Sequence, residues 1–189
     1  MRVLLGLALV AFSLAGCSAG SGPPRLEAAP QDVAQKDDQF KPYREITTPQ
    51  VRVGALPTAL GLTLSARIDR QSSQVRYVLR TEVIYVGSGK RNYESARDSS
   101  AATLRTERVA GNARCKPGVE CTYDEIVMIE LPETALRQAR TSGYRLKLFA
   151  RNGPEIEIGI PGPQIAGLLD KVDASAPGPA TARAPNANR

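Results

Sequence analysis

Few side chains of this chain have a type and spacing that could do chemistry. Glu155 and Glu157 alternate along a predicted strand, which places their Cα atoms roughly 6.5–7 Å apart on one face. Glycosidases use paired carboxylates at comparable separations for acid–base catalysis. Two acids on a solvated strand face are the commoner arrangement, and nothing nearby in the sequence forces one of them to stay protonated. The pair therefore supports catalysis only as an alternative function.

Residue type excludes several other sites. The chain contains no histidine, which rules out triads that use imidazole and ordinary zinc hydrolase sites. Ser88, Gly89 and Lys90 are similar to the end of a phosphate-binding loop, but Ile84 and Arg91 occupy positions where such a loop needs Gly and Ser or Thr. We expect a hairpin turn there, no metal site, no cofactor and no enzymatic activity.

The N-terminus has the three parts of a secretory signal. Arg2 precedes an uncharged apolar stretch over 3–15, and small residues follow it. The stretch is too short to span a bilayer, which needs roughly 20 apolar residues. Residues 14–17 read Leu-Ala-Gly-Cys, so a cysteine stands directly at the expected cut site. An ordinary cleaved signal with an incidental cysteine is the alternative.

The quartet at 14–17 closely resembles the lipobox of bacterial lipoproteins. This resemblance implies a signal peptide over 1–16, diacylation of the Cys17 thiol with fatty acids such as palmitate, and acylation of the freed amine. Ser18 follows in place of an aspartate, which in Gram-negative members of that class implies sorting to the outer membrane. Two or three acyl chains hold a protein on a membrane far more firmly than one.

Cys115 and Cys121 are the two remaining cysteines. An exported chain meets an oxidising compartment, and Pro117-Gly118 between the two cysteines is a turn dipeptide. A metal site would need two further ligands, and a redox pair would favour Cys-x-x-Cys spacing. We therefore predict a structural disulfide between Cys115 and Cys121.

Positive charge is concentrated in the middle of the chain. Residues 67–116 contain eleven basic and five acidic residues, whereas the whole chain has a formal net charge of +6. Arginine suits bidentate contact with phosphate or carboxylate. The candidate contacts with an anionic partner are Arg76, Arg80, Arg91 and Arg97. A solvated sheet face is the alternative, and nucleic acid is a poor candidate because no aromatic stacking platform is interleaved with these residues.

The elements that would position these residues are mainly strands. QVRYVLRTEVIYV (74–86) alternates between an apolar and a mixed face, which predicts a half-buried antiparallel strand. GSGKRN (87–92) predicts a turn that returns NYESAR (92–97) beside that strand. The other predicted strands are 62–68, 102–109 and 123–131, and YRLKLFARNGPEIEIGI (144–160) predicts a hairpin.

Local signals refine the hairpin and add two helices. Asn152-Gly153 favours a two-residue type I′ turn, although Pro154 implies that pairing starts beyond it or lies on a sheet edge. Two helices are predicted over PETALRQAR (132–140) and GPQIAGLLDKV (162–172). Pro132 and Pro163 suit their first helical turns. The second helix places Ile165, Leu168, Leu169 and Val172 on one stripe.

The predicted fold is α+β and predominantly antiparallel β, either a sandwich or a curled sheet, with one or two short helices. Residues 17–42 are expected to be an acylated cysteine and a flexible tether, residues 43–172 a single globular domain, and residues 173–189 a disordered Ala/Pro-rich tail.

These observations favour a non-catalytic outer-membrane lipoprotein that faces the periplasm and serves as an interaction or assembly module. Its partners would be the membrane, through the lipid anchor, and an envelope protein or anionic envelope component. Two alternatives stay open: a binder of anionic lipid or cell-wall glycan through an arginine-rich sheet face, and a cell-wall enzyme that uses the paired carboxylates.

Overall fold

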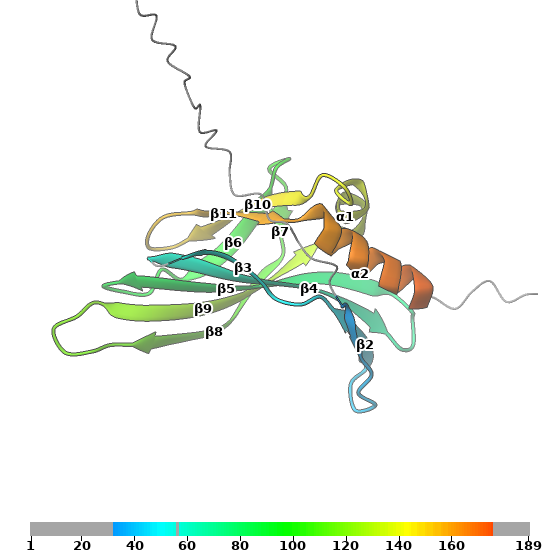
Figure 1. The fold of residues 1–189 in the computed structure, drawn as a ribbon, viewed down its shortest axis with the longest axis horizontal. Coiled ribbons are helices and arrows are strands. Elements are labelled where there is room, and N and C mark those ends of the chain that lie inside the picture. Colours follow the sequence, from blue (N-terminus) through cyan, green and yellow to red (C-terminus); the bar gives the residue numbers. More distant parts are fainter. Residues whose placement is uncertain (1–31, 56, 176–189) are drawn as a thin grey trace, which may run out of the picture.

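The computed structural model of the 189-residue chain describes residues 32–55 and 57–175. This part of the chain forms two antiparallel β-sheets and two helices (Figure 1). The mainly antiparallel α+β fold predicted from the sequence is confirmed. The predicted signal peptide (1–16) and Cys17 lie outside the described residues.

The larger sheet, sheet A, has seven strands. Six of them follow the order β1-β2-β4-β5-β9-β8, and β3 pairs with the same edge of β4 as β2. The strands are β1 (Ala34–Lys36), β2 (Tyr43–Thr47), β3 (Val51–Ala55), β4 (Thr58–Asp69), β5 (Val75–Gly87), β8 (Thr106–Arg114) and β9 (Cys121–Leu131).

β5 lies at the centre of sheet A and confirms the predicted alternation. Its side chains at odd positions from Tyr77 to Tyr85 are buried, whereas Arg76, Arg80 and the other even positions except Val78 are at least partly exposed. The same period of two recurs in β9, where Val127 and other odd positions are buried. A period of two assigns alternate side chains to opposite faces of a sheet.

Thr48 lies where the chain passes from β2 to β3 along the edge of β4. Its backbone N–H donates to the carbonyl of Leu64 at 2.9 Å, and its hydroxyl accepts the Leu64 N–H at 3.1 Å. The same hydroxyl accepts the amide of Gln164, from the C-terminal helix, at 2.8 Å. These three buried bonds join two edge strands and the helix at one point.

The smaller sheet, sheet B, has the strand order β11-β10-β6-β7. Its strands are β6 (Tyr93–Asp98), β7 (Thr103–Leu104), β10 (Tyr144–Ala150) and β11 (Ile156–Ile160). The prediction that residues 92–97 return beside the long strand is wrong, because β6 pairs with β10 and β7 while both edges of β5 are occupied by β4 and β9. Turn residues reverse the chain without specifying its pairing partner.

The predicted hairpin over 144–160 is present as β10 and β11, with β11 on a sheet edge and its pairing beginning at Ile156, beyond Pro154. The two-residue type I′ turn is wrong, because only Gly153 of the Asn152-Gly153 pair has a positive φ, +121°. The N–H of Asn152 donates instead to the carbonyl of Arg91 at 2.9 Å. A contact with the β5–β6 loop thus replaces the local turn.

Two helices pack beside the sheets. α1 (Glu133–Gln138) is shorter than predicted, and α2 (Gly162–Ser175) buries the predicted stripe of Ile165, Leu168, Leu169 and Val172. Arg44 of β2 donates to the carbonyl of Ser175 at the end of α2, at 2.7 Å.

Gly143, after α1, has a φ of +83°. A Cβ at this position would lie 2.7 Å from the carbonyl oxygen of Ile160. Only glycine suits that position.

The ordered body extends past both predicted boundaries. β1, which pairs with β2, lies inside the segment 17–42 that the sequence assigns to the tether. α2 continues to Ser175, into the segment 173–189 assigned to the tail. The sequence of β1 has no local pattern that predicts a strand, because this segment is extended by its pairing with β2.

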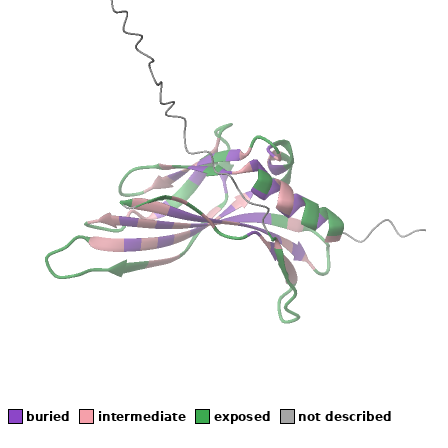
Figure 2. Cartoon of the chain, in the orientation of Figure 1, coloured by how far each residue is buried: buried purple, intermediate pink, exposed green. Residues whose placement is uncertain are grey.

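Sheet B and α2 lie on the same side of sheet A (Figure 1). The buried residues of both sheets and of α2 belong to one hydrophobic core cluster. Figure 2 shows buried positions in both sheets and in α2. The opposite side of sheet A, which we call the outer face, is covered by no helix or strand of the described ranges. It carries the even-numbered side chains of β5 and β9.

Candidate functional site

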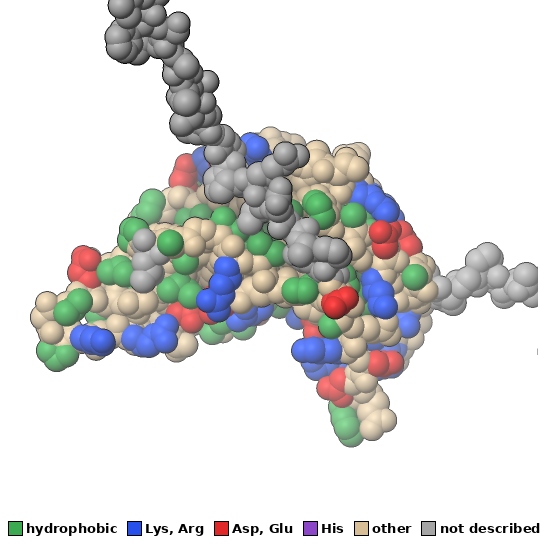
Figure 3. All heavy atoms as spheres, viewed as in Figure 1, with side chains coloured by type: hydrophobic (Ala, Val, Ile, Leu, Met, Phe, Trp, Pro, Cys, Tyr) green, Lys and Arg blue, Asp and Glu red, His purple; other side chains and the backbone are tan. Residues whose placement is uncertain are grey.

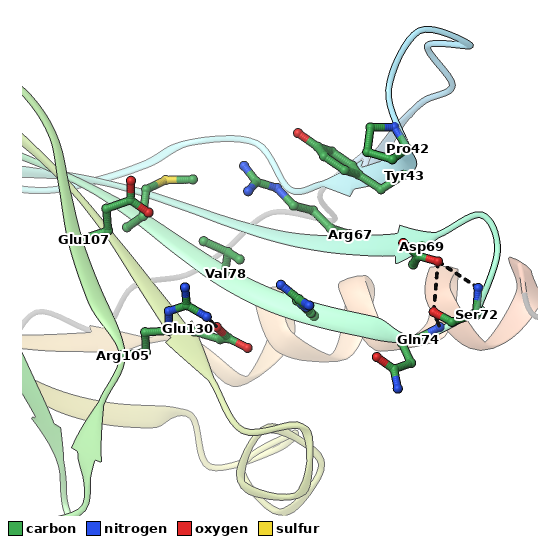
Figure 4. A pocket seen from close by; sticks show the side chains of 12 residues that line it. Pro42, Tyr43, Arg67, Asp69, Ser72, Gln74, Val78, Arg105, Glu107 and Glu130 are labelled. Carbon is green, nitrogen blue, oxygen red and sulfur yellow. Dashed lines mark hydrogen bonds and ion pairs between the residues drawn. The ribbon is translucent and has the colours of Figure 1, made fainter.

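The outer face of sheet A contains a hollow of about 330 Å³, which we call the outer-face hollow. Its lining comes from β2, β4, β5, β8 and β9 and from the turn between β4 and β5. Figure 4 shows Tyr43, Arg67, Val78 and Glu107 on the near side of the sheet, with a helix behind it. The hollow thus draws on segments that are far apart in the sequence.

Two arginines stand directly opposite one another in this hollow. Arg67 of β4 and Arg76 of β5 are cross-strand partners. Arg67 donates to the carboxylate of Glu45 at 3.0 Å, and its guanidinium lies 5.1 Å from the centre of the Tyr43 ring. Arg76 makes no ion pair within 4.0 Å with any residue in the described ranges. Like charges in directly opposite positions destabilise a sheet.

The acid at the end of β4 is engaged by its own turn. Asp69 accepts the N–H of Gln71 and both the N–H and the hydroxyl of Ser72, at 2.7–3.0 Å (Figure 4). These hydrogen bonds, chiefly those from Ser72, lower the pKa of Asp69, and the charge of Arg76 lowers it further. Asp69 therefore attracts Arg76 electrostatically without forming an ion pair with it.

The other side of the hollow combines apolar and charged groups. Val78 and Met128 belong to its lining, and Val78 is only 8% exposed although it lies on the open face. Arg105 lies 3.8 Å from the carboxylate of Glu130. Glu107 is exposed and makes no ion pair with a described residue. An apolar floor with charged groups of both signs around it is typical of a polar binding surface.

The outer face as a whole is mixed in charge rather than basic. The excess of arginine in residues 67–116 is met by acids from outside that window, because Glu45 of β2 and Asp124 and Glu130 of β9 lie on the same face. Figure 3 shows both Lys or Arg and Asp or Glu side chains along the lower margin of the molecule. A charge balance counted along the sequence therefore overstates the positive charge of this surface.

The four candidate arginines do not lie on one face. Arg76 and Arg80 share the outer face of sheet A, as the alternation predicts. Arg91 is half-buried, with its guanidinium 4.1 Å from the centre of the Tyr85 ring. Arg97 lies in sheet B, directly opposite Lys147. Only Arg76 and Arg80 can contact one partner surface together, and only Arg76 lines the outer-face hollow.

Arg80 belongs to a second charged group on the outer face. Its guanidinium lies 3.7 Å from Glu82, which also accepts the amide of Gln50 at 3.0 Å. Burial, and next the charge of Glu82, raise the pKa of Asp124. One carboxylate oxygen of Asp124 is buried and makes no hydrogen bond with a described residue. Glu82 and Asp124 thus form a close pair of acids that destabilises the charged form of Asp124.

The sequence analysis missed a buried carboxylate on the opposite face of β9. Glu125 is fully buried and accepts a hydrogen bond from the hydroxyl of Tyr85. It also accepts the backbone N–H groups of Arg91, Asn92 and Tyr93 at 3.0–3.3 Å. The carboxylate therefore fixes the start of β6 against sheet A. The available signal was an acid in an inward position of an otherwise apolar alternation.

Tyr85 supports this cluster as a hydrogen-bond donor. Burial first, and then the hydrogen bond to Glu125, raise the pKa of Tyr85 well above its ordinary value. Its ring stacks on that of Tyr123, with the ring centres 5.3 Å apart. Glu125 also borders a second hollow of about 230 Å³, beside Lys90 and Arg108. Because the carboxylate accepts one hydroxyl and three backbone N–H groups, the cluster is structural in character.

Glu155 and Glu157 are placed apart from both hollows. Lys147 lies 2.6 Å from Glu155, and Arg145 lies 3.8 Å from Glu157. Both carboxylates are at least half exposed. Glu155 precedes β11, so the two acids do not belong to one regular strand as expected. Exposed ion pairs of this kind contribute little to stability, and the two carboxylates do not face one another across a cleft of the described chain.

The predicted disulfide between Cys115 and Cys121 is present, with the two Cα atoms 4.2 Å apart. It closes the loop between β8 and β9. The residues Ser88–Lys90 lie in the connection between β5 and β6. The predicted hairpin turn there is wrong, because β5 pairs with β4 and β9 and not with β6. In residues 32–55 and 57–175, no three acidic or cysteine side chains are grouped as metal ligands, and no helix is long and apolar enough to cross a membrane.

No protein-family model matches the chain, and comparison with curated proteins and with solved structures found no match. The chemistry of the described surfaces therefore carries the functional argument.

Proposed function

We propose that this protein is a lipid-anchored outer-membrane lipoprotein whose β-rich domain faces the periplasm and binds an envelope partner without catalysing a reaction. The observation that carries this proposal is the open outer face of sheet A, with its charged hollow. One face of sheet A packs against the core. On its outer face, five strands contribute the apolar and charged side chains that line the hollow.

The Leu-Ala-Gly-Cys sequence at 14–17 supports the anchor. Acylation of Cys17 would attach the chain 15 residues before Asp32, the first residue that the structure describes. A segment of that length reaches at most about 50 Å. The domain would therefore stay near the membrane surface, where an envelope partner meets it at a raised local concentration.

Binding is favoured over catalysis by the placement of the acids. Glu155 and Glu157 are exposed and each lies beside a cation, and neither borders a hollow. Glu125 is enclosed by hydrogen-bond donors. The outer-face hollow instead has the apolar floor and mixed polar rim of a binding surface.

Two experiments test this function. Replacing Cys17 by Ser should abolish fatty-acid labelling and release the protein from membranes; a variant that still pellets with membranes after a high-salt wash contradicts the anchor. For the binding surface, a photo-crosslinking amino acid at Gln74, on the rim of the outer-face hollow, should give a discrete adduct in intact cells. The same group at Ser95, exposed in sheet B, serves as the control. Equal or absent adducts at the two positions contradict binding through the outer face.

A further inference from the structure

We propose that the outer-face hollow receives an acidic side chain of a partner polypeptide, with the carboxylate held between Arg67 and Arg76. This inference rests on the proposed function and specifies the chemistry of the partner. Three features of the hollow carry it: the pairing of the two arginines, the composition of its lining and its size.

The two arginines form a receptor for one anionic group. Arg67 is already oriented by Glu45 and by the Tyr43 ring, and it projects from the position directly opposite Arg76. Arg76 has no ion-pair partner in the described part of the chain. A carboxylate between the two guanidinium groups would relieve their repulsion and accept charge-assisted hydrogen bonds from both.

The lining favours a polypeptide over a polyanionic surface. Glu107, Glu130 and Asp69 line the same hollow as the two arginines, so a membrane rich in anionic lipid or a phosphate-bearing polymer would meet several negative charges. A single Asp or Glu side chain avoids them. Val78 and Met128 supply an apolar floor against which a neighbouring apolar residue of the partner can pack.

The size of the hollow is consistent with this occupant. About 330 Å³ lies at the lower end of the roughly 300–1,000 Å³ found for ligand sites. This space accommodates one or two side chains rather than a folded domain. The remaining contact area would come from the mixed rim of the outer face, as in other protein interfaces.

The inference is tested with a defined probe on the full-length acylated protein in non-ionic micelles, labelled with ¹⁵N-arginine. Titration with the blocked tripeptide acetyl-Leu-Glu-Leu-amide should shift the Nε–H signals of Arg67 and Arg76 in a saturable manner. The matched peptide with Gln in place of Glu should leave them unchanged. Arg76→Gln should weaken binding about tenfold, as expected for loss of a charge-assisted contact.

Arg80→Gln is the matched control, because Arg80 lies on the same face of the same strand but outside the hollow. This variant should bind the Glu peptide as the unaltered protein does. Equal responses to the Glu and Gln peptides, or none to either, overturn the inference. So does selective saturation of the same two signals by inorganic phosphate or by phosphatidylglycerol added to the micelles, because the site then recognises phosphate. Crosslinking at Gln74 that persists unchanged in Arg76→Gln would overturn the acidic-group inference while leaving the proposed function intact.

Discussion

The carboxylate of Glu125 accepts the backbone N–H of Arg91 at 3.0 Å and thereby joins the core face of sheet A to the strand that begins sheet B. The same carboxylate accepts the N–H groups of the next two residues and the hydroxyl of Tyr85. A fully buried acid with only donors around it is stable as long as all of those donors stay paired.

Glu125→Gln should lower the free energy of unfolding by about 2–4 kcal/mol, because the amide group would face N–H donors and leave them unpaired. Thermal and urea unfolding followed by circular dichroism measure this loss. Glu120→Gln, at an exposed position of the disulfide loop, is the control and should change stability by less than about 0.5 kcal/mol. Similar stabilities for the two variants would show that Glu125 does not hold the layers together.

Arg76→Glu should raise the free energy of unfolding by about 0.2–1 kcal/mol, because an acid directly opposite Arg67 converts a repulsive pair into an attractive one. Arg80→Glu should have the opposite sign, since it replaces the partner of Glu82 by a like charge. Urea unfolding of both variants provides the comparison. Clear destabilisation by Arg76→Glu would identify Arg76 as a structural partner and remove the case for an unsatisfied cation in the hollow.

Asp124→Asn should stabilise the protein at pH 7. Burial and Glu82 raise the pKa of Asp124 in the folded state above its ordinary value of 3.8. The stability contributed by this group is therefore present below the unfolded pKa and is lost as the pH rises through the folded pKa. The gain in melting temperature on substitution should shrink as the pH falls toward about 3.

Asp173→Asn provides a control of opposite sign. Arg137, at 2.8 Å, lowers the pKa of Asp173. Its stabilisation is present above the unfolded pKa and is lost as the pH falls through the folded pKa, so this variant should melt lower than the unaltered protein at pH 7. Parallel pH profiles for the two variants would refute the assignment for Asp124.

The disulfide should contribute about 2 kcal/mol or less, since it closes a short loop. Replacing Cys115 and Cys121 by Ser should lower the melting temperature without unfolding the domain, because the core lies elsewhere. Mass analysis without reduction should find the two cysteine peptides linked in protein isolated from the envelope. Free thiols at both positions would contradict a structural bridge.

The strand pattern was predictable because alternation and turn residues are local. β4, β5 and β9 contain the predicted strands 62–68, 74–86 and 123–131 almost entirely, and the α2 stripe follows from its spacing. The predicted strand 102–109 is wrong in its bounds, because this segment divides into β7 of sheet B and the start of β8 of sheet A. The pairing of β6 was not predictable, because its longer partner, β10, and the Glu125 carboxylate that binds its first residue both lie far along the chain. β1 escaped prediction because its order comes from pairing with β2.

The candidate site was predictable only in part. Alternation correctly assigned Arg76 and Arg80 to one face of β5. The acids that offset their positive charge belong to β2 and β9, whose pairing the sequence did not predict. The opposition of Arg67 and Arg76 depends on register, which the hairpin sequence alone did not fix. The hollow itself requires five strands to be placed side by side.

The most direct measurement of the central claim is the occupancy of the outer face in native membranes. Full-length proteins with Gln74→Cys or Ser95→Cys are compared for their rate of maleimide labelling in native envelopes and in vesicles of extracted envelope lipids. A bound partner should slow labelling at Gln74→Cys several-fold in envelopes relative to vesicles, and should leave Ser95→Cys unchanged. Equal rates at Gln74→Cys in the two preparations would contradict a partner on the outer face of sheet A.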